Sequence, residues 1–220
     1  MMEIDQLRRE IRALRQRNHE NELFFPIRSL NACLTRSAIS DILRTTSLEA
    51  WGVPEIVDMI ENGGHKVFAI LVLLKKPDLI GRFLQYDHFT ERSLDMQIPF
   101  PRQALDEIIP EIADEFEEQQ WEFAIPIFSQ RLFEGRFPRD SRMPFVGKSR
   151  ELGRGAFGRV WEVHVPAGHH SFDGTDPSQV QLSLAENRPV LIKLRRPHLP
   201  SKNLNKITML LMILDLMNMR

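Results

Sequence analysis

The chain of 220 residues has few of the features that mark specialised classes of protein. The first of these is cysteine. Cys33 is its only cysteine, which excludes an internal disulfide and a zinc site built from several thiolates. Since secreted folds stapled by disulfides need paired cysteines, we expect an intracellular protein of the cytoplasm or nucleus. Cys33 itself fits a small apolar packing residue better than a nucleophile.

Long hydrophobic runs are also missing. The longest, residues 67–74 and 207–216, are well short of the roughly 20 residues that a membrane-spanning helix needs. The first five residues, M-M-E-I-D, contain no apolar signal core. We therefore expect a soluble protein without a membrane partner.

No excess of one charge is present, because 29 Lys and Arg face 30 Asp and Glu. This balance gives no reason to expect a nucleic-acid partner. The charges are unevenly placed, however: residues 102–122 hold eight acids and one base, and residues 188–206 hold six bases and no acid. Such stretches can pair with each other or with partners. The acids of residues 102–122 fit the solvated side of a helix better than a metal site.

Residues 1–22 are predicted to form one exposed helix. Ile4, Leu7, Ile11 and Leu14 alternate steps of three and four, as in a coiled-coil seam, and Asn18 then ends the pattern after two heptads. Two heptads are marginal in water. Two interpretations stay open: the helix docks on its own chain or frays, or it mediates weak self-association.

From residue 23 to about residue 140 the pattern predicts a helical domain with short breaks. Val53-Pro54 suits the start of a helix, and Asn62-Gly63-Gly64 suits its end. The apolar run 67–74 favours a buried helix over a central strand, because alanine and leucine are good helix formers. Pro77 opens another short helix, and Pro110 either starts a new helix or kinks the one around it.

The pattern changes near residue 136. Residues 137–144 contain two prolines and indicate a linker. Residues 159–165 then alternate with period two and predict a strand, a polar loop follows, and residues 189–194 predict a second strand. The fold class is therefore α+β, with a mostly helical N-terminal domain followed by antiparallel strands.

The most informative motif is G-x-G-x-x-G at Gly153, Gly155 and Gly158, with Val160 two residues later. Two unrelated phosphate-binding devices share this motif. A dinucleotide-binding oxidoreductase needs a helix after the last glycine. A protein kinase needs a strand there, so that the glycine turn between two strands covers the triphosphate. The alternation after Gly158 favours the kinase arrangement.

A second candidate site residue is Lys193, which ends the apolar stretch V-L-I-K. In protein kinases a lysine on such a strand pairs with the α- and β-phosphates. The ordinary alternative is an edge-strand lysine that extends to solvent. Lys193 lies 35 residues after Gly158, more than a simple hairpin needs, and the polar residues 166–187 account for the excess.

Together these motifs resemble the fungal protein-kinase-domain proteins that carry a helical N-terminal extension. Residues 68–74, 119–128, 143–145 and 163–172 are also similar to that group. The resemblance implies ATP binding with Mg2+ and serine/threonine phosphorylation by a partial kinase domain, an incomplete small lobe, at residues 146–220. It implies these roles for this chain: phosphate contacts from Gly153, Gly155 and Gly158, adenine packing by Leu152 and Val160, and phosphate pairing by Lys193.

The departures from that family concern catalysis. Residues 195–220 contain no glutamate to hold the lysine, and their only acid is Asp215. The H-R-D and D-F-G motifs that supply the base and the magnesium ligands are absent, so we expect a truncated chain without kinase activity. The competing hypothesis is an interaction module, in which the helical domain binds a protein partner and the kinase lobe is vestigial.

Overall fold

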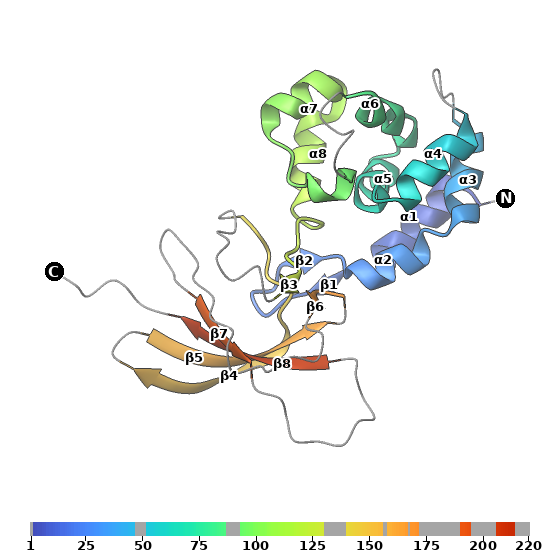
Figure 1. Cartoon of the computed structure of the whole chain (residues 1–220). Coiled ribbons are helices and arrows are strands. Elements are labelled where there is room, and N and C mark those ends of the chain that lie inside the picture. Colours follow the sequence, from blue (N-terminus) through green and yellow to red (C-terminus); the bar gives the residue numbers. More distant parts are fainter. Residues whose placement is uncertain are drawn as a thin grey trace. The chain divides into compact units, whose positions relative to one another are not determined.

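The computed structural model divides the chain into two compact units, which are described separately (Figure 1). A helical unit comprises Met1–Arg15 and Ile27–Ala124, and a strand unit comprises Gln16–Pro26 and Ile125–Arg220. The α+β class is confirmed. The residues that the structure describes are 2–46, 52–86, 93–129, 140–155, 158–166, 168–171, 190–194 and 206–213.

The helical unit contains eight α-helices and three short 3-10 helices within its described residues. They are α1 (Ile4–Ala13), α2 (Ile27–Cys33), α3 (Arg36–Arg44), α4 (Val53–Glu61), α5 (His65–Leu73), η1 (Pro77–Leu79), α6 (Ile80–Gln85), η3 (Leu94–Met96), α7 (Arg102–Ile108), η4 (Pro110–Ile112) and α8 (Ala113–Gln120).

Helix α5 forms the centre of this unit. Every residue from Val67 to Leu73 is buried, and α5 contacts α1, α2, α4, α6 and α8 (Figure 1). A helix that is apolar all round must be enclosed on all sides, because no face of it suits water. The prediction of a buried helix at residues 67–74 is therefore confirmed.

The helices begin and end where helix-starting and helix-ending residues in the sequence indicate. Helix α4 begins at Val53 with Pro54 in its first turn and ends before Asn62, as predicted. Gly63 adopts a φ of 125°, which suits a residue without a Cβ. Pro110 starts a new helical segment instead of kinking α7. Thr35 caps α3 by accepting a hydrogen bond from the Ala38 N–H at 3.3 Å.

Helix α5 is capped by a residue distant in sequence. The Asp95 carboxylate accepts hydrogen bonds from the backbone N–H groups of Lys66 (2.8 Å) and Val67 (3.3 Å). The Asp95 backbone N–H donates in turn to the Gly63 carbonyl at 2.8 Å. Burial raises the pKa of the Asp95 carboxyl, and the nearby Lys66 charge acts in the opposite direction. Asp95 thereby satisfies two of the free donors at this helix start.

Another buried polar contact links the segment before α7 to α8. The Gln120 side chain is 1% exposed. Its Oε1 accepts a hydrogen bond from the Phe100 N–H at 2.7 Å, and its Nε2 donates to the Phe100 carbonyl at 3.1 Å. One amide side chain therefore satisfies both backbone groups of a buried residue, as a strand partner would.

The acids of residues 102–122 lie largely in solvent, as predicted. Asp106, Glu107, Asp114, Glu115 and Glu118 are among those exposed. Arg102, the one base of the stretch, forms ion pairs with Asp106, Asp114 and Glu117. Its guanidinium offsets part of the local negative charge.

The prediction of one helix over residues 1–22 is wrong. Helix α1 ends at Ala13, and a hairpin of β1 (Gln16–Arg17) and β2 (Leu23–Phe24) follows. Asn18 explains the change, since its Oδ1 accepts hydrogen bonds from the backbone N–H groups of Glu20 and Glu22 at 3.0 and 2.9 Å. Such bonds compete with the helix for backbone donors.

The a/d seam faces the protein's own core. Leu7 and Ile11 are fully buried within the helical unit, so α1 docks on its own chain. Ile4 and Leu14 of the same seam are half-buried. The helical unit ends at Ala124, and the chain from Ile125 onward belongs to the strand unit.

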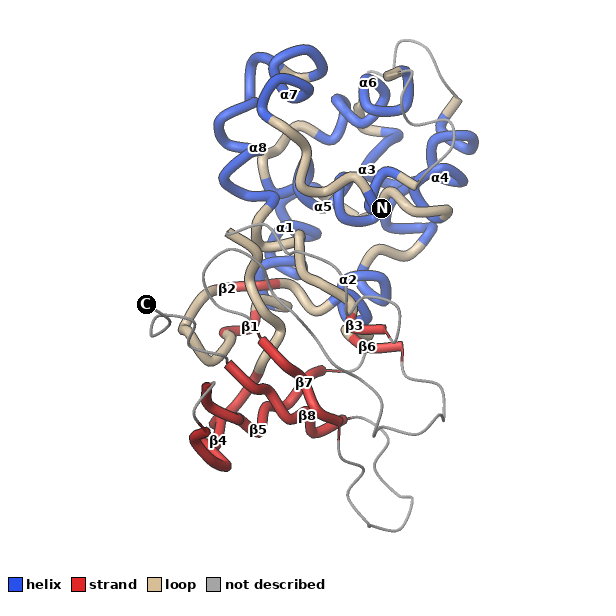
Figure 2. Tube along the Cα trace, turned by 60° about the vertical axis from the view of Figure 1, so that its left-hand side comes forward, coloured by secondary structure: helices blue, strands red, loops and turns tan. Residues whose placement is uncertain are grey.

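The strand unit contains a four-stranded antiparallel sheet with the strand order β4-β5-β8-β7 (Figure 2). Its strands are β4 (Val146–Gly155), β5 (Gly158–Pro166), β7 (Val190–Leu194) and β8 (Lys206–Ile213). The short β3 (Phe128–Ser129) and β6 (His170–Ser171) form a separate parallel pair.

The predicted strands at residues 159–165 and 189–194 are confirmed as β5 and β7. Strand β8 was not predicted, although it occupies the centre of the sheet between them. Antiparallel pairing to both β5 and β7 satisfies its backbone on both edges.

A small aromatic core holds the start of the strand unit together. Phe128 stacks on Phe145 with ring centroids 5.8 Å apart, and Phe24 meets the buried His169 ring edge-on at 5.8 Å. Asn18 Nδ2 donates to the Met143 carbonyl at 3.2 Å, so the early hairpin is bonded to the segment before β4. Within the described residues, no helix is both long and apolar enough to cross a membrane.

Candidate functional site: the glycine hairpin

The three motif glycines lie on one β-hairpin. Gly155 at the end of β4 pairs with Gly158 at the start of β5, and Gly153 pairs with Val160 two rows further along. A strand therefore both precedes and follows the glycine turn. This is the arrangement of a kinase glycine loop. A dinucleotide-binding fold would have a helix after Gly158, so that interpretation is excluded.

Leu152 lies at an irregularity of the hairpin. Glu151 pairs with Trp161 and Gly153 with Val160, so Leu152 is an extra residue on β4. Such a bulge bends its strand and increases the local twist next to the turn. A second irregularity lies between Val146 and Arg150. Bulges of this kind are frequent beside binding sites, and both lie on the strand that leads into the glycines.

Two arginines pair directly beside the turn, and the sequence interpretation missed them. Arg154 on β4 is the register partner of Arg159 on β5, in the row next to the Gly155–Gly158 pair. Like charges at opposed positions of an antiparallel pair destabilise it. The signal was visible in R-G-A-F-G-R, where the arginines flank the glycines symmetrically.

The register places Val160 and Lys193 on the same face of the sheet. Val160 shares a row with Met212 and Leu191, and Lys193 shares the row of Leu210 and Glu162, two residues further along β5. Rows two residues apart lie on one face, because the side-chain period of a strand is two. By the same alternation the buried Val163 and Val165 belong to the opposite face.

The sheet does not bring Lys193 to the glycine turn. Strand β8 lies between β5 and β7, so two strand spacings, about 10 Å, separate Lys193 from Glu162 in the same row. Gly158 lies four residues further along β5, which puts the Lys193 and Gly158 Cα atoms roughly 17 Å apart. The glycines, Leu152 and Val160 are thus assembled on one hairpin, and Lys193 stands apart from them.

The described residues contain no preformed metal site, because no group of three or more His, Cys, Asp or Glu side chains among them could hold a metal ion. His169 packs between Phe24 and the Pro126 carbonyl, which lies 3.4 Å from its Nδ1, and therefore has a structural position.

Comparisons with protein-family models, with curated proteins and with solved structures find no match. The functional interpretation therefore depends on the sequence motifs and on the hairpin itself.

Proposed function

We propose that the glycine hairpin binds the phosphates of ATP in the manner of a protein kinase small lobe. The observation that carries this proposal is the strand–turn–strand form of G-x-G-x-x-G, with Gly155 paired to Gly158. Glycines at such a turn let backbone N–H groups approach phosphate oxygens without obstruction by a Cβ. The paired Arg154 and Arg159 add positive charge beside the same turn.

The face that carries Val160 would receive the adenine, with Leu152 at its edge. Lys193 lies on this face too, but two strands away from Glu162. Arg159 directly precedes Val160 on β5, so strand alternation places the Arg154–Arg159 row on the other face, although this row is closer to the turn than Lys193 is. We therefore propose the backbone N–H groups of the glycine turn as the main phosphate contacts, with Arg154, Arg159 and Lys193 as weaker sources of positive charge.

Calorimetric titration with Mg-ATP, ADP, AMP and adenosine tests the proposal. Affinity should rise with the number of phosphates and fall by about two- to fivefold in Arg154→Ala and Arg159→Ala, since charges without a direct hydrogen bond to the phosphates are weakened by water and salt. Lys193→Ala should have a smaller effect. Arg9→Ala, which removes an exposed arginine of α1 in the helical unit, is the matched control. Equal affinity for adenosine and ATP, or no binding, would contradict phosphate recognition.

Phosphoryl transfer is a separate matter. The 220 residues lack the H-R-D and D-F-G motifs that supply the base and the metal ligands in protein kinases. We propose that this chain binds nucleotide without transferring phosphate. Incubation of the purified chain with radiolabelled ATP and a mixture of acceptor proteins should give no labelled product. Label that depends on the purified chain, and that a mock purification without the chain does not give, would overturn this proposal.

The alternative function is a helical interaction module. It is favoured by the helical unit, which has its own complete core around α5 and needs no nucleotide to bury it. The two proposals are compatible, because they concern different units of the chain.

A further inference from the structure

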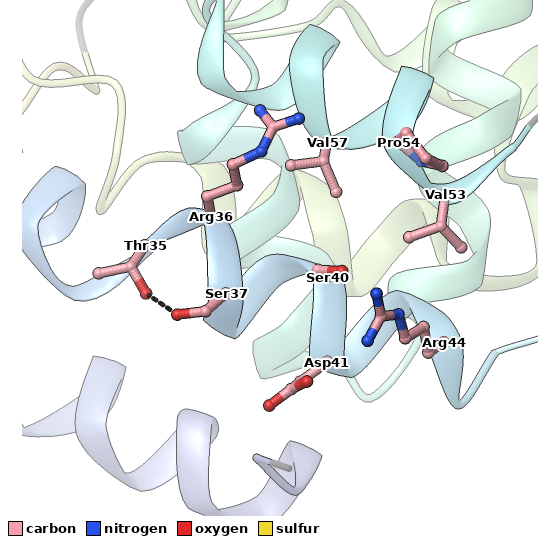
Figure 3. A pocket seen from close by; sticks show the side chains of 9 residues that line it. All are labelled: Thr35, Arg36, Ser37, Ser40, Asp41, Arg44, Val53, Pro54 and Val57. Atoms are coloured by element: carbon pink, nitrogen blue, oxygen red, sulfur yellow. Dashed lines mark hydrogen bonds between the residues drawn. The ribbon is translucent and has the colours of Figure 1, made fainter.

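A groove in the helical unit lies between α3 and α4 (Figure 3). Its volume is about 720 Å3, within the roughly 300–1,000 Å3 of ordinary ligand sites. Ser40 and Arg44 belong to its polar side, and Val53, Pro54 and Val57 form its apolar side. The groove is remote in sequence from the glycine hairpin, and nothing in the proposed nucleotide site uses it.

The polar side presents donors that have no partner within the described part of the chain. Ser40 and Arg44 are four residues apart on α3, so they lie on the same face of the helix. In Figure 3 the Arg44 guanidinium lies close to Ser40. Neither side chain forms a hydrogen bond or ion pair with another described residue.

The other charges of the groove are already engaged. Arg36 forms ion pairs with Asp58, at 2.6 Å, and with Glu61. The carboxylate of Asp41, the one acid among the lining residues, accepts a hydrogen bond from the Met2 backbone N–H at 2.8 Å. Among the described residues that line the groove, Arg44 is therefore the cation available to a ligand.

Arginine recognises carboxylates through parallel N–H donors, and a serine hydroxyl can add a third hydrogen bond. The wall opposite is aliphatic, with Val57 buried and Val53 half-buried. A ligand that matches both sides carries one carboxylate next to an aliphatic group. Extended peptides with a glutamate between leucines have this chemistry, and their length suits an open groove better than a small acid does.

We infer that the α3–α4 groove is a docking site for an acidic peptide segment of a partner protein. A glutamate or aspartate of the segment bonds to Arg44 and Ser40, and a neighbouring aliphatic side chain packs on the exposed Pro54 and the half-buried Val53. This site gives the helical unit a binding role that is independent of nucleotide.

The test titrates the full 15N-labelled chain with a blocked pentapeptide that has one glutamate between two leucines. Amide shifts should centre on residues 36–44 and 53–57. Replacing the peptide glutamate by glutamine should weaken binding about tenfold, and Arg44→Ala should do the same, as expected for a lost charge-assisted hydrogen bond. Ser40→Ala should weaken it less. Arg9→Ala removes an exposed arginine from α1 and should leave the affinity unchanged.

Several outcomes would overturn the inference. Equal binding of the glutamine peptide would show that the carboxylate is not recognised. If the peptide binds Arg44→Ala as tightly as it binds Arg9→Ala, Arg44 does not belong to the site. Hexanoate that binds as tightly as the peptide would indicate a site for small acids instead of a peptide. Because Arg44 is exposed, Arg44→Ala should fold normally, and an unchanged Tm verifies this.

Discussion

Two apolar segments of similar length, α5 and β8, adopt different structures in the two units. Helix α5, H-K-V-F-A-I-L-V-L, hydrogen-bonds within itself and is buried on all sides. Strand β8, K-I-T-M-L-L-M-I, obtains its backbone partners from β5 and β7. Alanine in α5 and threonine in β8 follow the intrinsic preferences of the two structures, but only weakly. The neighbouring segments decide the outcome: α5 lies among helices, and β8 joins two strands, β5 and β7, that the sequence already predicts.

The largest effect should follow from emptying the core around α5. Phe68 is fully buried, so Phe68→Ala removes a large side chain and leaves a cavity. We expect the free energy of unfolding of the helical unit to fall by about 3–5 kcal/mol. Urea denaturation followed by far-UV circular dichroism measures the change. The surface variant Arg9→Ala should stay within about 0.5 kcal/mol of the parent, and a similar loss in both variants would show that α5 is not the centre of the core.

Proline at equivalent positions of β8 and β7 tests the strand order. Leu211 pairs with Trp161 on one side and Ile192 on the other, so Leu211→Pro should disturb both neighbours. We expect a loss of about 2–3 kcal/mol, because the substitution leaves a partner carbonyl without its donor. Ile192→Pro, on the edge strand β7, should have a smaller effect. Hydrogen exchange of the β5 amides measures the effect of each substitution. Faster exchange in Ile192→Pro than in Leu211→Pro would contradict the order β4-β5-β8-β7.

A smaller loss of stability is expected when the polar contact between Gln120 and Phe100 is removed. Gln120→Leu introduces an apolar side chain of similar size and removes the hydrogen bonds that Gln120 makes to the buried Phe100 N–H and carbonyl. The free energy of unfolding should fall by about 2 kcal/mol. Gln103→Leu, on the exposed surface of α7, is the control and should be nearly neutral. Thermal unfolding compares the parent, Gln120→Leu and Gln103→Leu. Equal midpoints in all three would contradict a stabilising role of Gln120.

The smallest effect concerns the cap of α5 and depends on pH. Burial raises the pKa of Asp95, so between its unfolded value near 3.8 and its folded value the folded state retains a proton that the unfolded chain releases. The stability that Asp95 contributes should therefore increase as the pH falls from 7 toward 4. Asp95→Asn keeps the acceptor for Lys66 and Val67 but cannot titrate.

Comparing the Tm of the parent and of Asp95→Asn at pH 7 and pH 4 measures this linkage. The difference should shift in favour of the parent at the lower pH. A shift in the opposite direction would mean that the two amide donors and Lys66, which favour the charged carboxylate, outweigh burial. Asp95→Ala, which removes the acceptor altogether, should lower the stability by about 1 kcal/mol at pH 7.

The sequence predicted local features well and distant pairings poorly. Proline and glycine marked both ends of α4, and period-two alternation marked β5. The hairpin after Ala13 escaped prediction because the seam of α1 masked the turn at Asn18. Strand β8 escaped because an apolar run has no period of its own, and its pairing depends on partners elsewhere in the chain.

The candidate site divides in the same way. The glycine turn is local, so its place between two strands followed from the residues after Gly158. The relation of Lys193 to that turn depends on which strands lie between them, and no spacing in the sequence indicates that. Arg154 and Arg159 were overlooked although they flank the glycines symmetrically in the sequence, and the hairpin register makes them direct partners.

The early hairpin has a consequence for synthesis. Asn18 emerges from the ribosome 125 residues before Met143, whose carbonyl it binds. At 5–20 residues per second this partner follows after roughly 6–25 s. During that interval Phe24 lacks the His169 ring on which it packs in the finished protein. The strand unit therefore cannot complete its folding in the order of translation. The hairpin of β1 and β2 completes its packing only after Met143 and His169 have been synthesised.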